Sequence, residues 1–161
     1  MSALNPYESF LDGRPVQDIL LSTPAALAQA VGRIPATSLT ASPAPGRWSA
    51  AQVVSHLADC EIAFGFRLRQ TLAEENHTIQ PFDQDKWAPP YSKMDAAIAL
   101  QTFAAVRAWN LELIRAAGSE GAARIATHPE RGTMTFQTIL ETMAGHDLNH
   151  LGQLHRLAAQ I

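Results

Sequence analysis

The chain has 161 residues, of which 47% are hydrophobic and 17% are charged, and its formal net charge is −3 at pH 7. This composition favours one globular domain over residues 1–161 and gives no electrostatic reason to expect a nucleic acid or an anionic membrane as a partner. A single cysteine excludes an intrachain disulfide, and no apolar stretch approaches the roughly 18 residues of a membrane span. The N-terminus lacks the basic and apolar regions of a signal peptide. We therefore expect a cytoplasmic protein.

The first stretch with helical periodicity covers residues 16–34. Pro24 can occupy the first position of a helix that is capped by Ser22 or Thr23, so this stretch forms either one helix or two. A loop rich in proline, serine and threonine follows at residues 35–47 and separates the stretch from the next helix.

The second predicted helix covers residues 49–74 and has the clearest start signal in the chain. Ser49 is a good N-cap residue, and Gln52 stands three positions later, as a capping box requires. Trp48 and Val53 occupy the positions of a hydrophobic staple around this start. The pattern therefore predicts a long amphipathic helix.

Two further helices follow in chain order. The third is predicted to begin at the box-like pair Ser92 and Asp95 and to end at Gly118, a residue typical of helix C-caps. The fourth begins at Thr135 and runs to the end of the chain. No segment shows sustained strand alternation, so the pattern predicts an all-α four-helix bundle. Its connections of roughly 14 to 20 residues exceed the usual length in bundles, and they allow crossovers that can cover one end.

The fourth predicted helix carries two histidines within its apolar stripe. At about 100° per residue, His150 lies about 40° from His146 on the helical wheel, whereas His155 lies about 180° away and faces solvent. A buried polar group without a partner costs about 1–3 kcal/mol, so both inward histidines need either hydrogen-bond partners or a metal ion. Their i, i+4 spacing places the two rings on one face at the separation that one metal ion needs.

The position of a third ligand distinguishes the possible metal sites. Asp147 follows the first histidine where zinc proteases of the H-E-x-x-H type have glutamate, and Arg156 stands where their extended motif has a third histidine. A third ligand must therefore come from upstream. His77 and His128 lie in predicted loops, whereas His56 lies at the edge of the apolar stripe of the second predicted helix.

His56, His146 and His150 are thus the only three histidines that are all helical and inward-facing. Three neutral imidazoles with an open fourth position are the usual arrangement of a catalytic divalent metal site. Imidazole ligation suits zinc, nickel, iron or copper. Cys60 lies one turn beyond His56 on the same face, and we interpret it as a small core residue in preference to a fourth ligand.

The segments around these histidines resemble the DinB/YfiT-like superfamily of metalloenzymes, specifically its DinB_2 type. The matching segments, in order, are PGRWSAAQVVSHLADCE, QPFDQDKWA, HPERGTMTFQTILETMAGHD and HDLNHLGQLHRL, so the likeness covers nearly the whole chain from about residue 21 onward. The family pattern has one histidine in HLAD and an H-x-x-x-H on the last helix, which correspond to His56, His146 and His150. The resemblance implies an up-down-down-up bundle, a divalent metal such as zinc or nickel, and often a homodimer.

Characterised relatives in that superfamily include thiol-dependent S-transferases and a mycothiol-dependent maleylpyruvate isomerase. From this resemblance our leading prediction is a metal-dependent S-transferase that acts on a small molecule with a low-molecular-weight thiol. A metal-dependent hydrolase is the enzymatic alternative. There are two non-enzymatic alternatives. One is a stress-response protein that binds a metal without catalysis, and the other is a bundle whose core histidines form hydrogen bonds and bind no metal.

A metal-activated nucleophile would need a proton acceptor nearby. Asp83 and Asp85 are candidates in the long loop at residues 75–93, which with Trp87 as an anchor forms either a functional lid or an ordinary solvated loop. Asp147 is a weaker candidate base, because its place beside His146 suits orientation of the imidazole better. Further candidates, for orienting an imidazole or binding an anionic substrate group, are Asp59, Asn149, Gln153, Arg124 and Arg131.

Overall fold

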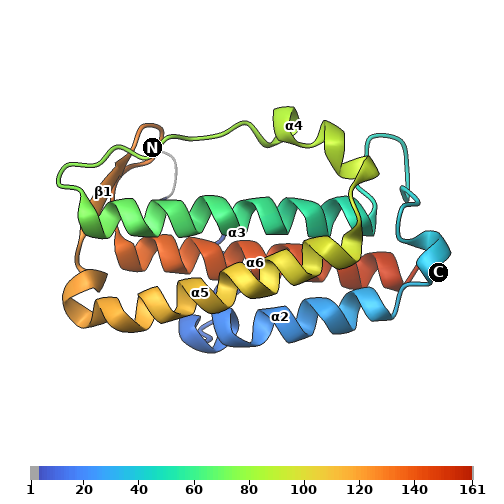
Figure 1. The fold of residues 1–161 in the computed structure, drawn as a ribbon, viewed down its shortest axis with the longest axis horizontal. Coiled ribbons are helices and arrows are strands. Elements are labelled where there is room, and N and C mark those ends of the chain that lie inside the picture. The colour runs from blue at the N-terminus through green and yellow to red at the C-terminus, as the bar shows by residue number, and fades with distance from the viewer. Residues whose placement is uncertain (1–3, 161) are drawn as a thin grey trace.

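Four long helices run side by side along the molecule (Figure 1). The structure is a computed structural model that describes residues 4–160. Its elements are α1 (Glu8–Leu11), α2 (Val16–Gly32), a 3₁₀ turn (Ala36–Ser38), α3 (Ala50–Ala73), α4 (Gln84–Trp87), a second 3₁₀ turn (Pro89–Lys93), α5 (Ala96–Ala122), β1 (Ile125–His128), β2 (Gly132–Thr135) and α6 (Phe136–Ala158). Among these described elements, no helix has the length and apolar character needed to cross a bilayer.

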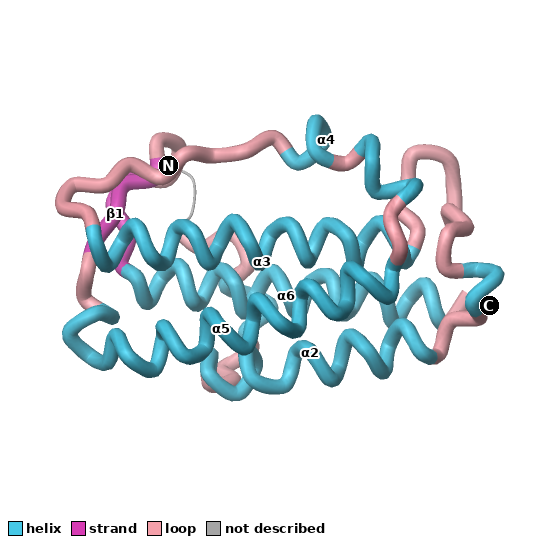
Figure 2. Tube along the Cα trace, in the orientation of Figure 1, coloured by secondary structure: helices cyan, strands magenta, loops and turns pink. Residues whose placement is uncertain are grey.

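The directions of the four bundle helices confirm the predicted up-down-down-up topology. Helices α2 and α6 run one way and α3 and α5 run the other, as the colour gradient in Figure 1 shows. Because α3 and α5 are parallel and pack together, the chain between them must return along the bundle. Residues 74–95 make this crossover along the outside of α3, with α4 near its middle (Figure 2). The predicted four-helix bundle with long crossover loops is therefore confirmed.

The starts of α3 and α6 are fixed by local hydrogen bonds, and the sequence predicts those at the start of α3. The Ser49 hydroxyl accepts a hydrogen bond from the Gln52 backbone N–H at 3.3 Å, and the Gln52 side chain accepts one from the Ser49 N–H at 3.0 Å. The Thr135 hydroxyl accepts from the Thr138 N–H at 3.1 Å. These bonds satisfy N–H groups that have no partner inside the helix, and they place each helix start at its predicted residue.

The ends of α5 differ from their prediction. Asp95 alone caps the start, where its carboxylate accepts from the backbone N–H groups two and three residues ahead at 2.7 and 3.1 Å. Ser92 lies in the preceding 3₁₀ turn and donates to the Pro89 carbonyl, so it takes no part in the cap. Gly118 does leave helical geometry, with φ of 57°, but a further helical turn follows it before the chain enters β1.

Helix α2 is continuous, although the sequence leaves open a division at Pro24. The hydroxyl of Thr23 donates back within the helix and does not cap a new one. Pro24 has no N–H, so the Leu20 carbonyl four residues earlier receives no helical hydrogen bond from it. The guanidinium of Arg107 on α5 donates to that carbonyl at 3.0 Å instead. Tertiary packing therefore satisfies the group that the proline leaves free.

A short antiparallel hairpin, β1 and β2, precedes α6, whereas the sequence analysis expects no strand. Each strand has four residues, which is too short for a convincing alternation of polar and apolar side chains. The hairpin also holds the crossover, because the Thr127 backbone N–H donates to the His77 carbonyl at 2.9 Å and the Ile79 N–H donates to the Thr127 carbonyl at 2.8 Å. His128 consequently ends a strand and does not lie in a loop.

Two hydrophobic clusters fill the bundle, one toward each end. On α3 the first cluster includes Cys60 and the second includes Leu57; on α6 they include Met143 and Leu154. On α6, His146 and His150 lie between Met143 and Leu154 along the chain. On α3, His56 immediately precedes Leu57 and lies among residues of the second cluster. All three histidines therefore place polar groups inside the apolar interior of the bundle.

Candidate metal centre

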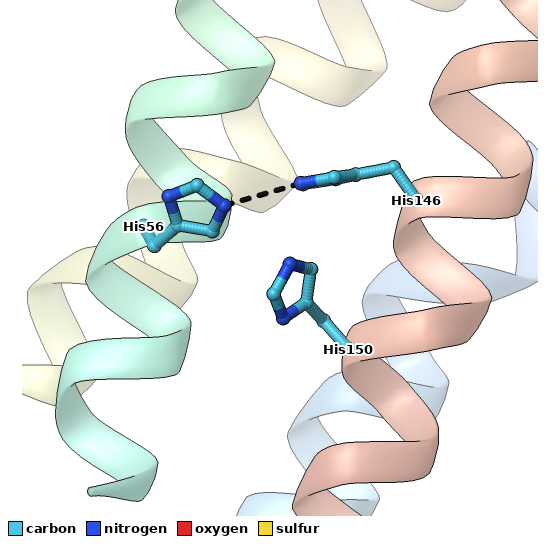
Figure 3. Close-up of side chains that lie close together, drawn as sticks. All are labelled: His56, His146 and His150. Carbon is cyan, nitrogen blue, oxygen red and sulfur yellow. Dashed lines mark hydrogen bonds between the residues drawn. The ribbon is translucent and has the colours of Figure 1, made fainter. Parts of the chain in front are cut away.

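Three histidines from two helices meet in the middle of the bundle. His56 projects from α3, and His146 and His150 project from successive turns of α6 (Figure 3). Each offers a ring nitrogen, and these nitrogens all lie within 4.8 Å of one another. The Nε2 atoms of His56 and His146 are 3.1 Å apart. The side chains are 1%, 5% and 9% exposed in that order, so the cluster is enclosed by protein.

The neighbours of the rings restrict their orientation. Trp48 packs on His56 with ring centres 4.9 Å apart, and Tyr7 meets His146 edge-on at 5.3 Å. His150 Nδ1 lies 3.0 Å from the side-chain amide oxygen Oε1 of Gln153, which is an acceptor, so this nitrogen carries the proton. Nε2 of His150 then keeps its lone pair, which is the form that binds a metal. Gln153 therefore occupies the supporting position that the sequence analysis considers for it.

Burial keeps all three imidazoles neutral in the metal-free protein. It lowers the pKa of His56 to about 3, with a further contribution from the nearby His150. Burial and the two neighbouring histidines hold the pKa of His146 well below its usual value. Burial also lowers the pKa of His150, although the bond to Gln153 acts in the opposite direction. At neutral pH the cluster thus presents three uncharged nitrogen donors.

Cys60 lies beside the cluster without the character of a ligand. Its sulfur is 3.5 Å from Nε2 of His56, and the side chain is buried. Burial raises the pKa of this thiol well above its usual value, so it stays protonated at neutral pH. Because the thiolate is the form that binds metals, this supports the interpretation of Cys60 as a core residue.

A cavity of about 200 Å³ reaches His56 and His146 from the side of the crossover. It is a small, polar space, below the size of most drug-binding pockets. Part of its wall comes from the predicted lid, residues 75–93, which contributes Pro81, Phe82 and Gln84. The remaining wall residues are Tyr7, Cys60, Phe64, Arg67, His128, Glu130, Arg131 and Thr142.

The three carboxylates suggested as proton acceptors lie away from this cavity. Asp83 caps α4 and pairs with Lys86 at 3.4 Å, and both Asp83 and Asp85 are exposed. Asp147 is 2% exposed and accepts a hydrogen bond from Arg107 at 2.8 Å. None of the three carboxylates belongs to the wall of the cavity. Asp59, suggested for orienting an imidazole, instead accepts from the Tyr91 hydroxyl at 2.7 Å.

Arg107 forms a buried ion network that sequence reasoning missed. Its guanidinium donates to both oxygens of Glu61 at 3.0 and 2.7 Å, to Asp147 at 2.8 Å and to the Leu20 carbonyl. Burial raises the pKa of Asp147 to about 6, although the Arg107 charge lowers it. The sequence could have indicated this buried arginine, because Arg107 stands four residues after Phe103 and so falls in the apolar stripe of its helix.

The sequence analysis found only some of the polar and charged residues of the cavity wall. It considered Arg131, whereas it did not consider Tyr7, Arg67 or Glu130. Arg67 carries a usable signal, because it stands eleven residues after His56 and so lies about 20° from it on the helical wheel. Tyr7 and Glu130 come from the N-terminal segment and the hairpin turn, whose positions no local pattern predicts.

Comparisons with known proteins identify a family and a solved structure with a similar fold. The family model of the DinB superfamily matches residues 19–154. A protein of Oceanobacillus iheyensis is 30% identical over 113 residues, which are 70% of this chain and 66% of that protein. A protein of Bacillus cereus strain 03BB102 is 24% identical over 97% of this chain and 95% of its own. Both relatives are provisionally named metal-dependent hydrolases.

The solved structure of YfiT from Bacillus subtilis superposes with a TM-score of 0.82 and 26% sequence identity. The match covers 90% of this chain and 84% of the YfiT chain. YfiT is described, again provisionally, as a metal-dependent hydrolase with an unusual four-helix bundle topology. A TM-score at this level over 90% of the chain shows that the two proteins share a fold.

Proposed function

This chain belongs to the DinB superfamily, and we propose that it is a metal-dependent hydrolase in which His56, His146 and His150 hold one divalent cation. The observation that carries the proposal is the enclosed cluster of three neutral imidazoles beside a small polar cavity. The provisional names of the relatives and of YfiT support hydrolysis as the reaction class.

The donor set fits a zinc or nickel ion. In a tetrahedral site with metal–nitrogen distances of about 2.0–2.1 Å, the ligand nitrogens lie about 3.3 Å apart. The 3.1 Å between the Nε2 atoms of His56 and His146 is close to that value, and the third nitrogen lies within 4.8 Å. Neutral imidazoles are the form that such ions bind. This spacing supports His56, His146 and His150 as three ligands of one ion.

A divalent ion bound by three histidines supplies Lewis acidity and generates a strong nucleophile from water at neutral pH. The chain itself has to bind the substrate and move the proton. Glu130 is the carboxylate in the cavity wall, and we infer that it accepts the proton of the attacking water. We prefer it to Asp83, Asp85 and Asp147, because none of these lines the cavity.

Tyr7 and Gln84 complete the polar wall, and they can orient a small polar substrate beside His56 and His146. The volume of about 200 Å³ limits the group that reaches the histidines to a small molecule or to one end of a larger one. A cavity beside the cluster also favours catalysis over a purely metal-binding role, which would need no space for a substrate.

The thiol-dependent S-transferase that the sequence analysis places first receives no support from the comparisons, which name hydrolases. Hydrolysis is therefore our leading proposal. A low-molecular-weight thiol as co-substrate and a homodimer remain predictions of the resemblance. Turnover with and without added thiol separates the two reactions, and sedimentation analysis tests the dimer.

The first experiment is elemental analysis of protein purified without a nickel column. We expect about one zinc or nickel ion per chain, which is lost in His56→Ala and in the double variant His146→Ala/His150→Ala. His155→Ala is the matched control, because this histidine is exposed on the same helix and should leave the metal content unchanged. Wild-type protein that takes up no divalent ion would overturn the proposal.

The metal-loaded protein is then assayed on a panel of carboxylic esters, amides and phosphoesters. We expect turnover that stops on chelation, needs no thiol, and falls by about 10²-fold or more in Glu130→Gln. Turnover that requires a thiol would favour the S-transferase. Metal binding without turnover of any panel member would favour the non-catalytic stress-response alternative.

A further inference from the structure

Two arginines from different elements line the cavity at the histidine cluster. Arg67 comes from α3, three turns beyond His56, and Arg131 comes from the turn between β1 and β2. Both also border a smaller void of about 20 Å³, whose wall includes the buried residues Ile79 and Met134. They therefore stand where a substrate that reaches the cluster would pass or rest.

The arginines keep most of their hydrogen-bond donors free. Arg67 donates one bond, to the Gln80 carbonyl at 3.2 Å, and its guanidinium lies 5.8 and 5.5 Å from the ring centres of Phe64 and Phe82. The two rings hold the guanidinium in place without using its N–H groups. Arg131 forms no side-chain hydrogen bond with residues 4–160. An arginine has five N–H donors, so the pair can bind a further acceptor.

Within the described part of the chain, neither Arg67 nor Arg131 forms an ion pair with a carboxylate. The cations in its ion pairs are His77, Lys86, Arg107 and Arg115, and none of these lines the cavity. Burial lowers the pKa of Arg67, and the nearby positive charge of Arg131 lowers it further. The positive charges of Arg67 and Arg131 repel each other, and an anion bound between them would offset this repulsion.

The summed charge of the cavity wall agrees with an anionic ligand. Burial and the two arginines lower the pKa of His128, so this side chain is neutral at pH 7. Arg67 and Arg131 contribute two positive charges and Glu130 contributes one negative charge, which leaves a net charge of +1. A divalent cation at the histidines would add to this positive potential and would attract anions into the cavity.

We propose that Arg67 and Arg131 bind an oxyanion, a carboxylate or a phosphate, on the molecule that enters the cavity, so that the hydrolase acts on small anionic substrates. The planar guanidinium matches both groups through paired hydrogen bonds. The identity of the reaction rests on the function proposed above. Anion binding does not, because the arginines are independent of the metal ligands.

The test titrates metal-free protein with inorganic phosphate and, separately, with acetate, and follows the arginine Nε–Hε signals by NMR. We expect the signals of Arg67 and Arg131 to shift with saturation. Arg67→Gln and Arg131→Gln should each weaken binding by about tenfold or more, as expected for the loss of a charged hydrogen-bond partner. Arg124→Gln is the control, because it removes the same charge near the hairpin but outside the cavity wall.

The variant His146→Ala/His150→Ala should still bind the anion, which separates this inference from the metal site. Saturation by only one of the two anions supports the proposal and selects between carboxylate and phosphate substrates. Equal weakening by Arg124→Gln would show a general charge effect and would overturn it, as would the absence of saturation with both anions. Circular dichroism checks that each variant is folded. If Arg67→Gln does not fold, Arg131→Gln, which changes a residue in a turn, still tests the proposal.

Discussion

Arg107 shows how one residue of α5 connects its helix to the three other long helices of the bundle. Its side chain is fully buried on α5, pairs with Glu61 of α3 and Asp147 of α6, and donates to the backbone of α2. A buried ion pair is often no more stable than an apolar contact of similar volume, but removal of one partner leaves an uncompensated charge. We therefore expect the largest loss in the free energy of unfolding when a substitution removes only one member of the network.

Arg107→Met tests this expectation. The substitution leaves two buried carboxylates without their cation, so we expect a loss of about 3–5 kcal/mol in the free energy of unfolding, measured by urea denaturation. Arg115→Met removes an exposed arginine from the same helix and should change stability by less than about 1 kcal/mol. Similar losses in both variants would contradict the role assigned to the network.

At the scale of the elements, α6 is fitted closely to the N-terminal segment. A Cβ atom on Gly145 would lie 2.5 Å from the backbone oxygen of Tyr7 and 2.7 Å from its Cβ. Tyr7 in turn contacts the ring of His146 and lines the cavity. The glycine therefore allows the N-terminal segment to approach the histidine cluster.

Gly145→Ala and Gly152→Ala form a matched pair on α6. Alanine stabilises a helix interior by about 1 kcal/mol relative to glycine, and at Gly152 the nearest obstacle is the flexible end of Arg156 at 3.5 Å. We expect Gly152→Ala to be neutral or stabilising. Gly145→Ala should lower the melting temperature and expose the N-terminal segment to protease, because the backbone of Tyr7 must move. Equal melting temperatures in the two variants would refute the close fit.

The elements also show what the sequence can and cannot predict. The capping box at Ser49 was predicted because its hydrogen bonds join residues three apart, and the start of α6 at Thr135 was predicted from the apolar pattern that follows it. The inward direction of the three histidines followed from helical period alone, since both helices are long. By contrast, the partners of Arg107 are 40 and 46 residues away, so no local pattern gives them. The cavity wall likewise draws on the hairpin, the crossover and the N-terminal segment, whose relative positions depend on tertiary packing.

At the scale of the whole molecule, the histidine cluster couples folding to protonation. His56 and His146 are 90 residues apart, so the cluster exists only when α3 and α6 have packed. In the unfolded chain each imidazole has a pKa near 6.5, whereas in the folded protein burial lowers it, to about 3 for His56. Below pH 6.5 the unfolded chain therefore binds protons that the folded protein does not, and stability falls.

We expect the free energy of unfolding of metal-free protein to decrease as the pH falls from 7 toward 4. Asp147 acts in the opposite direction, because its pKa is raised to about 6 in the folded state, so it gains a proton on acidification before the unfolded chain does. Three buried histidines outweigh this one carboxylate. Urea denaturation at pH 7, 5.5 and 4 measures the slope, which should be shallower in His146→Ala/His150→Ala. A slope unaffected by the double substitution would contradict this account.

The crossover between α3 and α5 has a consequence for how this protein can diversify. Helix α3 has 24 residues and is about 36 Å long, a distance that about eleven extended residues can span. The connection at residues 74–95 is about twice that long, so the topology requires only half of it. The surplus includes the stretch with Pro81, Phe82 and Gln84 that walls the cavity. Insertions and deletions there can reshape the substrate space while the helices and the three histidines stay where they are, which separates the evolution of specificity from that of the scaffold.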